Sequence, residues 1–106
     1  MHKEDKDLDS NGITIQPIKG EGYKNGKPLE LTSNEYKLLC LFMGNPEMVL
    51  SPEQILDCLR DHKGNYIDHR MLAVYIRKLR MKIEDDPAKP KRIVTVRGMG
   101  YKWKCQ

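Results

Sequence analysis

The sequence lacks the features that mark membrane, secreted and disulfide-linked proteins. Charged or polar residues interrupt every hydrophobic stretch, so no run approaches the roughly 20 apolar residues that a membrane-spanning helix needs. The first eleven residues are polar and carry charges of both signs, which argues against a secretory signal peptide. The sequence contains no internal repeat and no low-complexity segment. We therefore expect a cytoplasmic protein of one domain, because 106 residues suffice for a single hydrophobic core.

Residues suited to catalysis or metal binding are also sparse. The three cysteines, Cys40, Cys58 and Cys105, are odd in number and widely spaced, so they fit neither a disulfide framework nor a Cys-x-x-Cys metal motif. Cys58 and His62 could share one helix face, but a structural zinc site needs four ligands. The sequence has no nucleophile motif around its histidines and no phosphate-binding loop. We expect no catalytic residue, no metal and no cofactor.

Positive charge gathers in the second half of the chain. The net charge is only +4, and residues 1–31 are nearly balanced. Between Asp68 and Lys104, by contrast, eleven lysines and arginines face four acidic residues. A basic half favours a polyanionic partner such as nucleic acid, although by itself it is equally compatible with a solvated surface or an acidic protein partner.

The N-terminal third is predicted to be a small antiparallel sheet. Residues 1–12 are polar and aperiodic, which indicates a linker or a disordered tail before a domain spanning residues 13–106. Alternation of apolar and polar residues then predicts strands at Ile13, Ile15 and Ile18, and again at Leu29 and Leu31. The Asn25-Gly26 pair between them is a strong hairpin signal, because a type I′ turn needs positive φ at both central residues.

Three helices are predicted to follow. Thr32 and Glu35 form a capping box before an apolar helix, and Ser51 caps a second helix that opens with Pro52. The third helix runs from about Asp68 to Glu84, and its apolar residues recur at spacings of four, three and four: Leu72, Ile76, Leu79 and Ile83. A loop rich in glycine and asparagine separates the second and third helices.

The last third of the chain is predicted to contain a helix with one basic face, followed by a basic hairpin. The side of the third helix opposite its apolar stripe carries Arg70, Val74, Arg77, Lys78 and Met81. The residues from Ile93 to Trp103 are typical of a hairpin with a turn at Gly98-Met99-Gly100. Such a helix fits the major groove of DNA, and an arginine beside the turn could reach the minor groove. The simpler alternative is that these charges only solvate an amphipathic helix.

Four segments, in order and with matching spacing, resemble one protein family. Leu31-Thr32-Ser33-Asn34-Glu35-Tyr36-Lys37-Leu38-Leu39 resembles the Leu-Thr-x-x-Glu-Phe-x-Leu-Leu signature of the effector domains of OmpR/PhoB-type response regulators. The segments from Asn45 to Leu56 and from Val74 to Ile83 are similar to that family's second and recognition helices. Thr95-Val96-Arg97-Gly98-Met99-Gly100-Tyr101 resembles its wing signature, Thr-Val-Arg-Gly-x-Gly-Tyr.

The resemblance implies an α+β fold, a winged helix-turn-helix with an N-terminal antiparallel sheet, three helices and a C-terminal β-hairpin wing. Family members bind double-stranded DNA at direct-repeat half-sites, usually as head-to-tail dimers, and regulate transcription in two-component systems. The receiver domain and the sensor histidine kinase of such a system would lie outside these residues. A contact with RNA polymerase is implied for the loop between the second and third helices, at His62, Lys63, Gly64, Asn65 and Tyr66.

The resemblance also implies which side chains bind DNA. The major-groove set would be Arg70, Met71, Val74, Tyr75, Arg77 and Lys78. Arg80 and Lys82 would lie nearer the DNA backbone, and Thr95 and Arg97 would serve the wing. Tyr101 and Trp103 are interpreted mainly as aromatic core residues that cover the third helix.

Three departures from the family pattern bear on these expectations. Pro52 stands where many relatives have an arginine, which removes one expected phosphate contact, and Met71 stands where relatives often have threonine. Arg60 occupies a region where many relatives carry tryptophan, before a loop about one residue longer than usual. The alternative function is a winged-helix module that binds proteins and not DNA. The basic residues on the third helix and on the hairpin argue against it.

Overall fold

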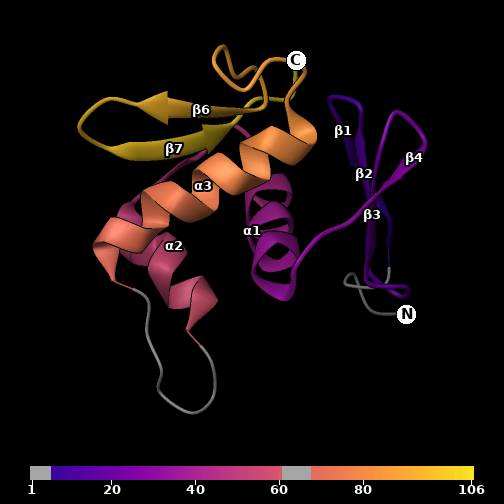
Figure 1. The fold of residues 1–106 in the computed structure, drawn as a ribbon, viewed down its shortest axis with the longest axis horizontal. Helices are drawn as coiled ribbons and strands as arrows, with labels where there is room; N and C mark the ends of the chain where they lie inside the picture. Colours follow the sequence, from indigo (N-terminus) through magenta and orange to yellow (C-terminus); the bar gives the residue numbers. More distant parts are fainter. Residues whose placement is uncertain (1–5, 61–67) are drawn as a thin grey trace.

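The computed structural model describes residues 6–60 and 68–106 and has the α+β order that the sequence predicts (Figure 1). In chain order the elements are β1 (Leu8–Ser10), β2 (Ile13–Gln16), β3 (Glu21–Lys24), β4 (Lys27–Leu29), α1 (Ser33–Gly44), β5 (Val49–Leu50), α2 (Pro52–Leu59), α3 (His69–Ile83), β6 (Ile93–Val96) and β7 (Gly100–Trp103). The chain is therefore a winged helix with an N-terminal antiparallel sheet and a C-terminal hairpin.

The N-terminal sheet is a four-stranded meander in the order β1-β2-β3-β4, and it starts earlier than predicted. The tail expected over residues 1–12 is wrong for its last part, because β1 pairs with β2 and Ser10 lies opposite Ile13. Asn11 and Gly12 both have positive φ, 51° and 80°, which matches the type I′ turn of a two-residue hairpin. Ile18, expected in a strand, is 79% exposed in the turn after β2.

The caps of α1 and α2 follow the sequence signals. Thr32 Oγ1 accepts a hydrogen bond from the Glu35 N–H at 3.2 Å, and Glu35 Oε1 accepts one from the Thr32 N–H at 2.9 Å. Ser51 and Gln54 make the same reciprocal pair before α2. These capping boxes satisfy N–H groups that have no partner within the helix.

Helix α3 lies across α1 and α2, with the hairpin β6–β7 along its other side (Figure 1). Its four stripe residues, Leu72, Ile76, Leu79 and Ile83, are all at most 3% exposed. Predicted from Asp68 to Glu84, the helix runs from His69 to Ile83, and the two predicted end residues are its N-cap and C-cap. The N-terminal sheet lies on the far side of α1 from the wing (Figure 1), so neither face of the sheet covers the exposed side of α3.

The wing is part of a three-stranded sheet in the order β5-β7-β6. The short strand β5, which the sequence did not predict, pairs Leu50 with Tyr101 and so connects the segment between α1 and α2 to β7. Glycine is required at Gly100, the first residue of β7: its φ is +147°, and a Cβ atom there would lie 2.0 Å from the Leu50 carbonyl oxygen.

One continuous core joins both sheets and the three helices. The fully buried side chains come from β2, α1, α2, α3 and the wing, and the largest is Trp103. Its indole Nε1–H donates a hydrogen bond to Ser10 Oγ at 3.0 Å, so the last strand contacts the first. The expectation that Trp103 is a core aromatic is confirmed, and the burial of this large side chain explains why the wing holds a fixed position on the helices.

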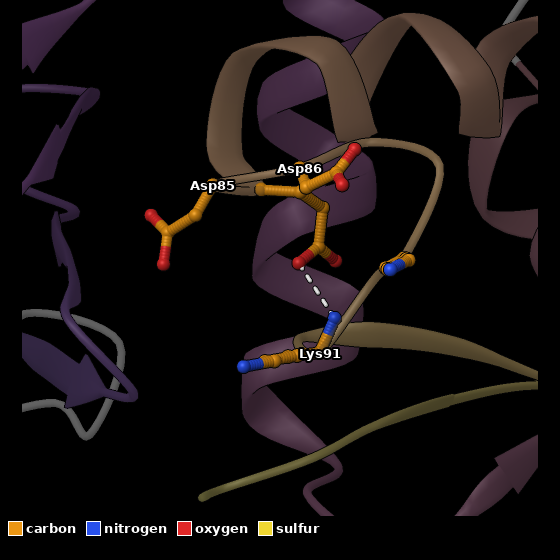
Figure 2. Close-up of a pocket in the computed structure, with 5 residues that line it drawn as sticks. Asp85, Asp86 and Lys91 are labelled. Carbon is orange, nitrogen blue, oxygen red and sulfur yellow. Dashed lines mark hydrogen bonds between the residues drawn. The ribbon is translucent and has the colours of Figure 1, made fainter.

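A buried carboxylate organises the loop after α3. Glu84 is 4% exposed and accepts hydrogen bonds from the backbone N–H groups of Lys91, Arg92 and Ile93 at 2.8 to 3.1 Å. Figure 2 shows the bond from Lys91, with the carboxylates of Asp85 and Asp86 pointing away from each other. The small pocket drawn there lies between this loop and the end of α3.

A buried arginine connects this loop to the N-terminal sheet. Arg92 is 6% exposed, and its guanidinium donates to the Asn11 carbonyl oxygen at 2.6 Å and to the Ile83 carbonyl oxygen at 2.7 Å. Lys24 of β3 forms an ion pair with Asp85 at 3.0 Å. The C-terminal end of α3 is therefore anchored both to the strand β6 that follows it and to the sheet.

We predict that Glu84→Ala lowers the free energy of unfolding by about 3 kcal/mol, because it leaves buried N–H donors without an acceptor. Urea denaturation of the two proteins measures the difference. The matched control is Glu30→Ala, at an exposed glutamate, for which we expect a change within about 0.5 kcal/mol. Equal losses in the two variants would contradict the role assigned to Glu84.

Candidate nucleic-acid interface

The outward face of α3 combines basic and apolar side chains. Arg70, Arg77 and Lys78 are exposed, and between them Met71 and Val74 are 44% and 39% exposed. Met81 extends this face toward the helix C-terminus and is 62% exposed. The helix itself, from His69 to Ile83, contains no acidic residue. Its exposed face therefore presents positive charge around a small apolar strip.

Two side chains in the first turn of α3, Arg70 and His69, lie against carboxylates. The Asp68 carboxylate accepts a hydrogen bond from the Arg70 backbone N–H at 2.9 Å and an ion-pair contact from Arg70 Nη2 at 2.9 Å. These bonds lower the pKa of Asp68 below its usual value. His69 Nε2 lies 3.7 Å from Glu53 of α2. Asp68 was predicted only as the start of the helix, and nothing in the local pattern distinguished it from an ordinary cap.

Arg80 connects α3 to the wing. Its Nε–H donates to the Ile93 carbonyl oxygen at 3.0 Å, and its Nη2 donates to Thr95 Oγ1 at 3.0 Å. The guanidinium also lies over the Tyr101 ring, 5.6 Å from the centroid. Two residues expected at the DNA backbone and the wing, Arg80 and Thr95, are therefore brought together and hydrogen-bond to each other.

Lys82 connects α3 to α1 and is 34% exposed. Its ammonium group donates to a carboxylate oxygen of Glu35 and to the backbone carbonyl of Glu30, which connects α3 to the start of α1. Burial raises the pKa of Glu35, but the hydrogen bonds from Lys82 and Thr32 outweigh it and hold the pKa below its usual value. Lys82 follows Lys78 by about one helical turn, but its ammonium group is bound to Glu35 and Glu30.

The remaining predicted residues divide between the helix and the wing. Tyr75 is half-buried, and its hydroxyl lies 3.5 Å from the Asn34 amide nitrogen of α1. Arg97 is exposed next to Gly98 in the turn of the hairpin, and Met99 beside it is 60% exposed. The wing thus presents one cation and one apolar side chain at its tip. The predicted polymerase-contact residues His62, Lys63, Gly64, Asn65 and Tyr66 lie outside the described residues.

Residues 6–60 and 68–106 contain no helix that is long and apolar enough to cross a membrane. This part of the chain also holds no group of three or more histidine, cysteine, aspartate or glutamate side chains arranged to bind a metal ion.

A three-helix core, a basic face on the third helix and a hairpin beside it define a winged-helix domain. A family model described as "Transcriptional regulatory protein, C terminal" matches residues 26–103. A transcriptional regulatory protein of Bacillus subtilis, YcbL, is 48% identical over 79 residues, which is 74% of this chain and 34% of that protein. The chain belongs to this family of C-terminal domains of transcriptional regulators. This membership confirms the expectation that it is not an enzyme.

Solved structures agree with this assignment. The response regulator DrrB of Thermotoga maritima, an OmpR/PhoB homologue, superposes with a TM-score of 0.83 at 26% identity, over 92% of this chain and 44% of that one. The DNA-binding domain of CpxR from E. coli superposes with a TM-score of 0.76 at 27% identity, over 93% and 96% of the two chains. The chain spans about a third of the length of the curated relatives it matches. The OmpR/PhoB-type fold predicted from the sequence motifs is confirmed.

The Glu35–Lys82 pair leads to a pH-dependent prediction. Because the folded-state pKa of Glu35 is lowered, its contribution is present above the unfolded-state pKa and is lost as the pH falls through the folded-state pKa. We expect Lys82→Met to cost about 1–3 kcal/mol of unfolding free energy at pH 7, because it leaves the buried Glu35 charge without its cation. The difference from the unmodified protein should shrink below about pH 4.5, the ordinary glutamate pKa.

Urea denaturation between pH 7 and pH 3.5 measures this difference. Lys78→Met on the same helix is the matched control and should change stability by no more than about 0.5 kcal/mol at either pH, because Lys78 is exposed. A penalty for Lys82→Met that stays constant over the whole pH range would show that lost packing, and not the ion pair, causes it.

Proposed function

We propose that this domain binds duplex DNA in a sequence-specific manner and regulates transcription as the output domain of a two-component response regulator. The observation that carries the proposal is the exposed face of α3, where Arg70, Arg77 and Lys78 surround Met71 and Val74. The relationship to the DNA-binding domain of CpxR adds support.

Helix α3 has the dimensions and chemistry for the major groove. Its 15 residues span roughly 22 Å, and a groove about 12 Å wide accepts one helix. Arginine and lysine can bind guanine N7 and O6 or neutralise phosphates, while exposed Met71 and Val74 can contact thymine methyl groups. We assign the base-contacting role to the exposed face of the helix from Arg70 to Lys78.

The wing is proposed to reach the adjacent minor groove through Arg97. A narrow minor groove has a strongly negative potential, which attracts an exposed arginine. Arg80 and Thr95 act here as positioning residues, because their mutual hydrogen bond and the Arg80–Ile93 contact fix the distance between helix and wing. Lys82 is given no direct contact, since Glu35 and Glu30 occupy its ammonium group.

The family to which the domain belongs suggests how it assembles with DNA and with other proteins. We infer that two copies bind direct-repeat half-sites head to tail, and that His62 to Tyr66 contact RNA polymerase. A receiver domain, switched by a sensor histidine kinase in the bacterial cytoplasm, would control the domain. The match covers only 34% of each of these curated relatives, which leaves room for such a domain in them.

A winged helix that binds only other proteins is the alternative. Such a module would be expected to offer a contiguous apolar patch on α3. The face instead combines three cations with Met71 and Val74, each less than half exposed. The charge pattern therefore favours a polyanion as partner.

Selection of random duplexes with the purified domain tests the proposal. We expect one enriched motif, and a binding constant for it that falls steeply with salt, with a logarithmic slope of about −0.9 per neutralised phosphate. No enriched motif together with a flat salt dependence would favour the protein-binding alternative.

A substitution on α3 tests the orientation of the helix. We predict that Lys78→Ala weakens binding to the selected site by about 1–3 kcal/mol, as expected for loss of a base contact, and affects scrambled DNA less. The control is Lys19→Ala, an exposed lysine in the N-terminal sheet away from α3, which should leave both affinities nearly unchanged. An equal loss on both DNAs would reassign Lys78 to the phosphates.

A further inference from the structure

We propose that Asp68 determines specificity by holding Arg70 in the orientation that binds a base edge. The inference rests on the proposed function, because it concerns how one side chain of the same face meets DNA. Neither the sequence motifs nor the helix pattern assigns Asp68 such a role. The geometry of its carboxylate does.

The position of the Asp68 carboxylate is fixed by the backbone. Asp68 is the N-cap of α3, with φ −61° and ψ 143°, and its Oδ1 accepts the Arg70 N–H at 2.9 Å. A cap of this kind directs the side chain along the start of the helix. The carboxylate is therefore placed before any DNA arrives, and the side chain of Arg70 starts two residues away from it.

The same carboxylate also holds the Arg70 guanidinium. Oδ2 accepts from Nη2 at 2.9 Å, and Oδ1 lies 3.4 Å from Nε, so one side of the planar group is occupied. The other edge, made by Nη1 and the second hydrogen of Nη2, has no hydrogen-bond partner among residues 6–60 and 68–106. The Arg70 side chain is 90% exposed, against 49% for Asp68. A free fork of two N–H donors is the arrangement that binds guanine O6 and N7 together.

The charge balance of the pair favours a base over a phosphate. A phosphate approaching Arg70 would also meet the negative charge of Asp68, whereas guanine O6 and N7 carry only partial charges. Glu53 of α2, which lies 3.7 Å from His69 Nε2, adds a second carboxylate near the start of α3. Arg77 lies further along a helix that contains no acidic residue, so a phosphate contact is better served there.

An exposed ion pair adds little to folding stability, and its value here is in binding. A guanidinium already held on one side loses less conformational freedom when it meets a base. Docking also removes water from the pair, which strengthens its attraction because the local dielectric constant falls. The Asp68–Arg70 ion pair should therefore contribute more free energy when the domain is bound to its specific site than in the free protein.

The substitution Asp68→Asn separates the helix-capping role of Asp68 from its ion pair with the Arg70 guanidinium. Asparagine caps a helix about as well as aspartate, so its Oδ1 can still accept the Arg70 N–H. Its second terminal atom becomes an NH₂ donor, which cannot accept from Nη2. Circular dichroism and thermal unfolding should therefore match the unmodified domain, and differences in binding then report on the orientation of Arg70.

The measured quantity is the ratio of affinities for the selected site and for scrambled DNA. For Asp68→Asn we expect this ratio to fall by roughly tenfold, as for one bidentate base contact, while binding to scrambled DNA rises and its salt slope steepens by about one phosphate. Asp86→Asn removes a negative charge at the opposite end of α3 and controls for net charge alone. It should leave the ratio unchanged.

A double variant completes the test. With Arg70→Ala already present, Asp68→Asn should no longer change the ratio, because the side chain that it orients is missing. The inference is overturned if Asp68→Asn alone keeps the ratio of the unmodified domain, or if its loss persists without Arg70. Failure of the proposed function is a separate result, since the unmodified domain would then enrich no motif at all.

Discussion

The burial of Leu72, Ile76, Leu79 and Ile83 along one side of α3 fixes the rotation of that helix about its axis. With these side chains in the core, the residues on the opposite side of the helix must point outward, whatever their charge. The exposed basic face is therefore a geometrical consequence of the apolar stripe. A helix held by its stripe alone could still slide or tilt, so its ends and its distance from the wing need further restraints. Those restraints are largely polar.

Charged side chains supply these restraints on α3 at three places. Arg92 holds the last turn of α3 against the N-terminal sheet, Lys82 connects the helix to the cap of α1, and Arg80 connects it to the wing. Each cation has hydrogen-bond partners fixed by backbone or by a cap, so each sets a distance as well as adding attraction. The positive charge counted in the sequence therefore has two uses. Part of it holds the helix, and part, at Arg77, Lys78 and Arg97, is exposed.

The features that could be predicted from the sequence are those that depend on residues close together along the chain. The capping box at Thr32 and Glu35, the Asn25-Gly26 turn and the stripe of α3 need only local rules, and all three are present. The first hairpin was missed although Asn11-Gly12 carries the same signal, because β1 has three residues and too little alternation to be recognised. The strand β5, two residues long, exists only through its pairing with β7.

The sequence could not show which cations hold α3 in place and which are exposed for binding, and the reason is physical. Arg80 finds Thr95 fifteen residues on, and Lys82 finds Glu35 forty-seven residues back, so their partners appear only once the chain has folded. On a helical wheel these residues look like the neighbouring Arg77 and Lys78. Asp68 and Arg70 are the opposite case, since they are only two positions apart in the sequence and only the side-chain geometry reveals the contact. Charge on a recognition helix therefore has to be assigned residue by residue, from what each cation already touches.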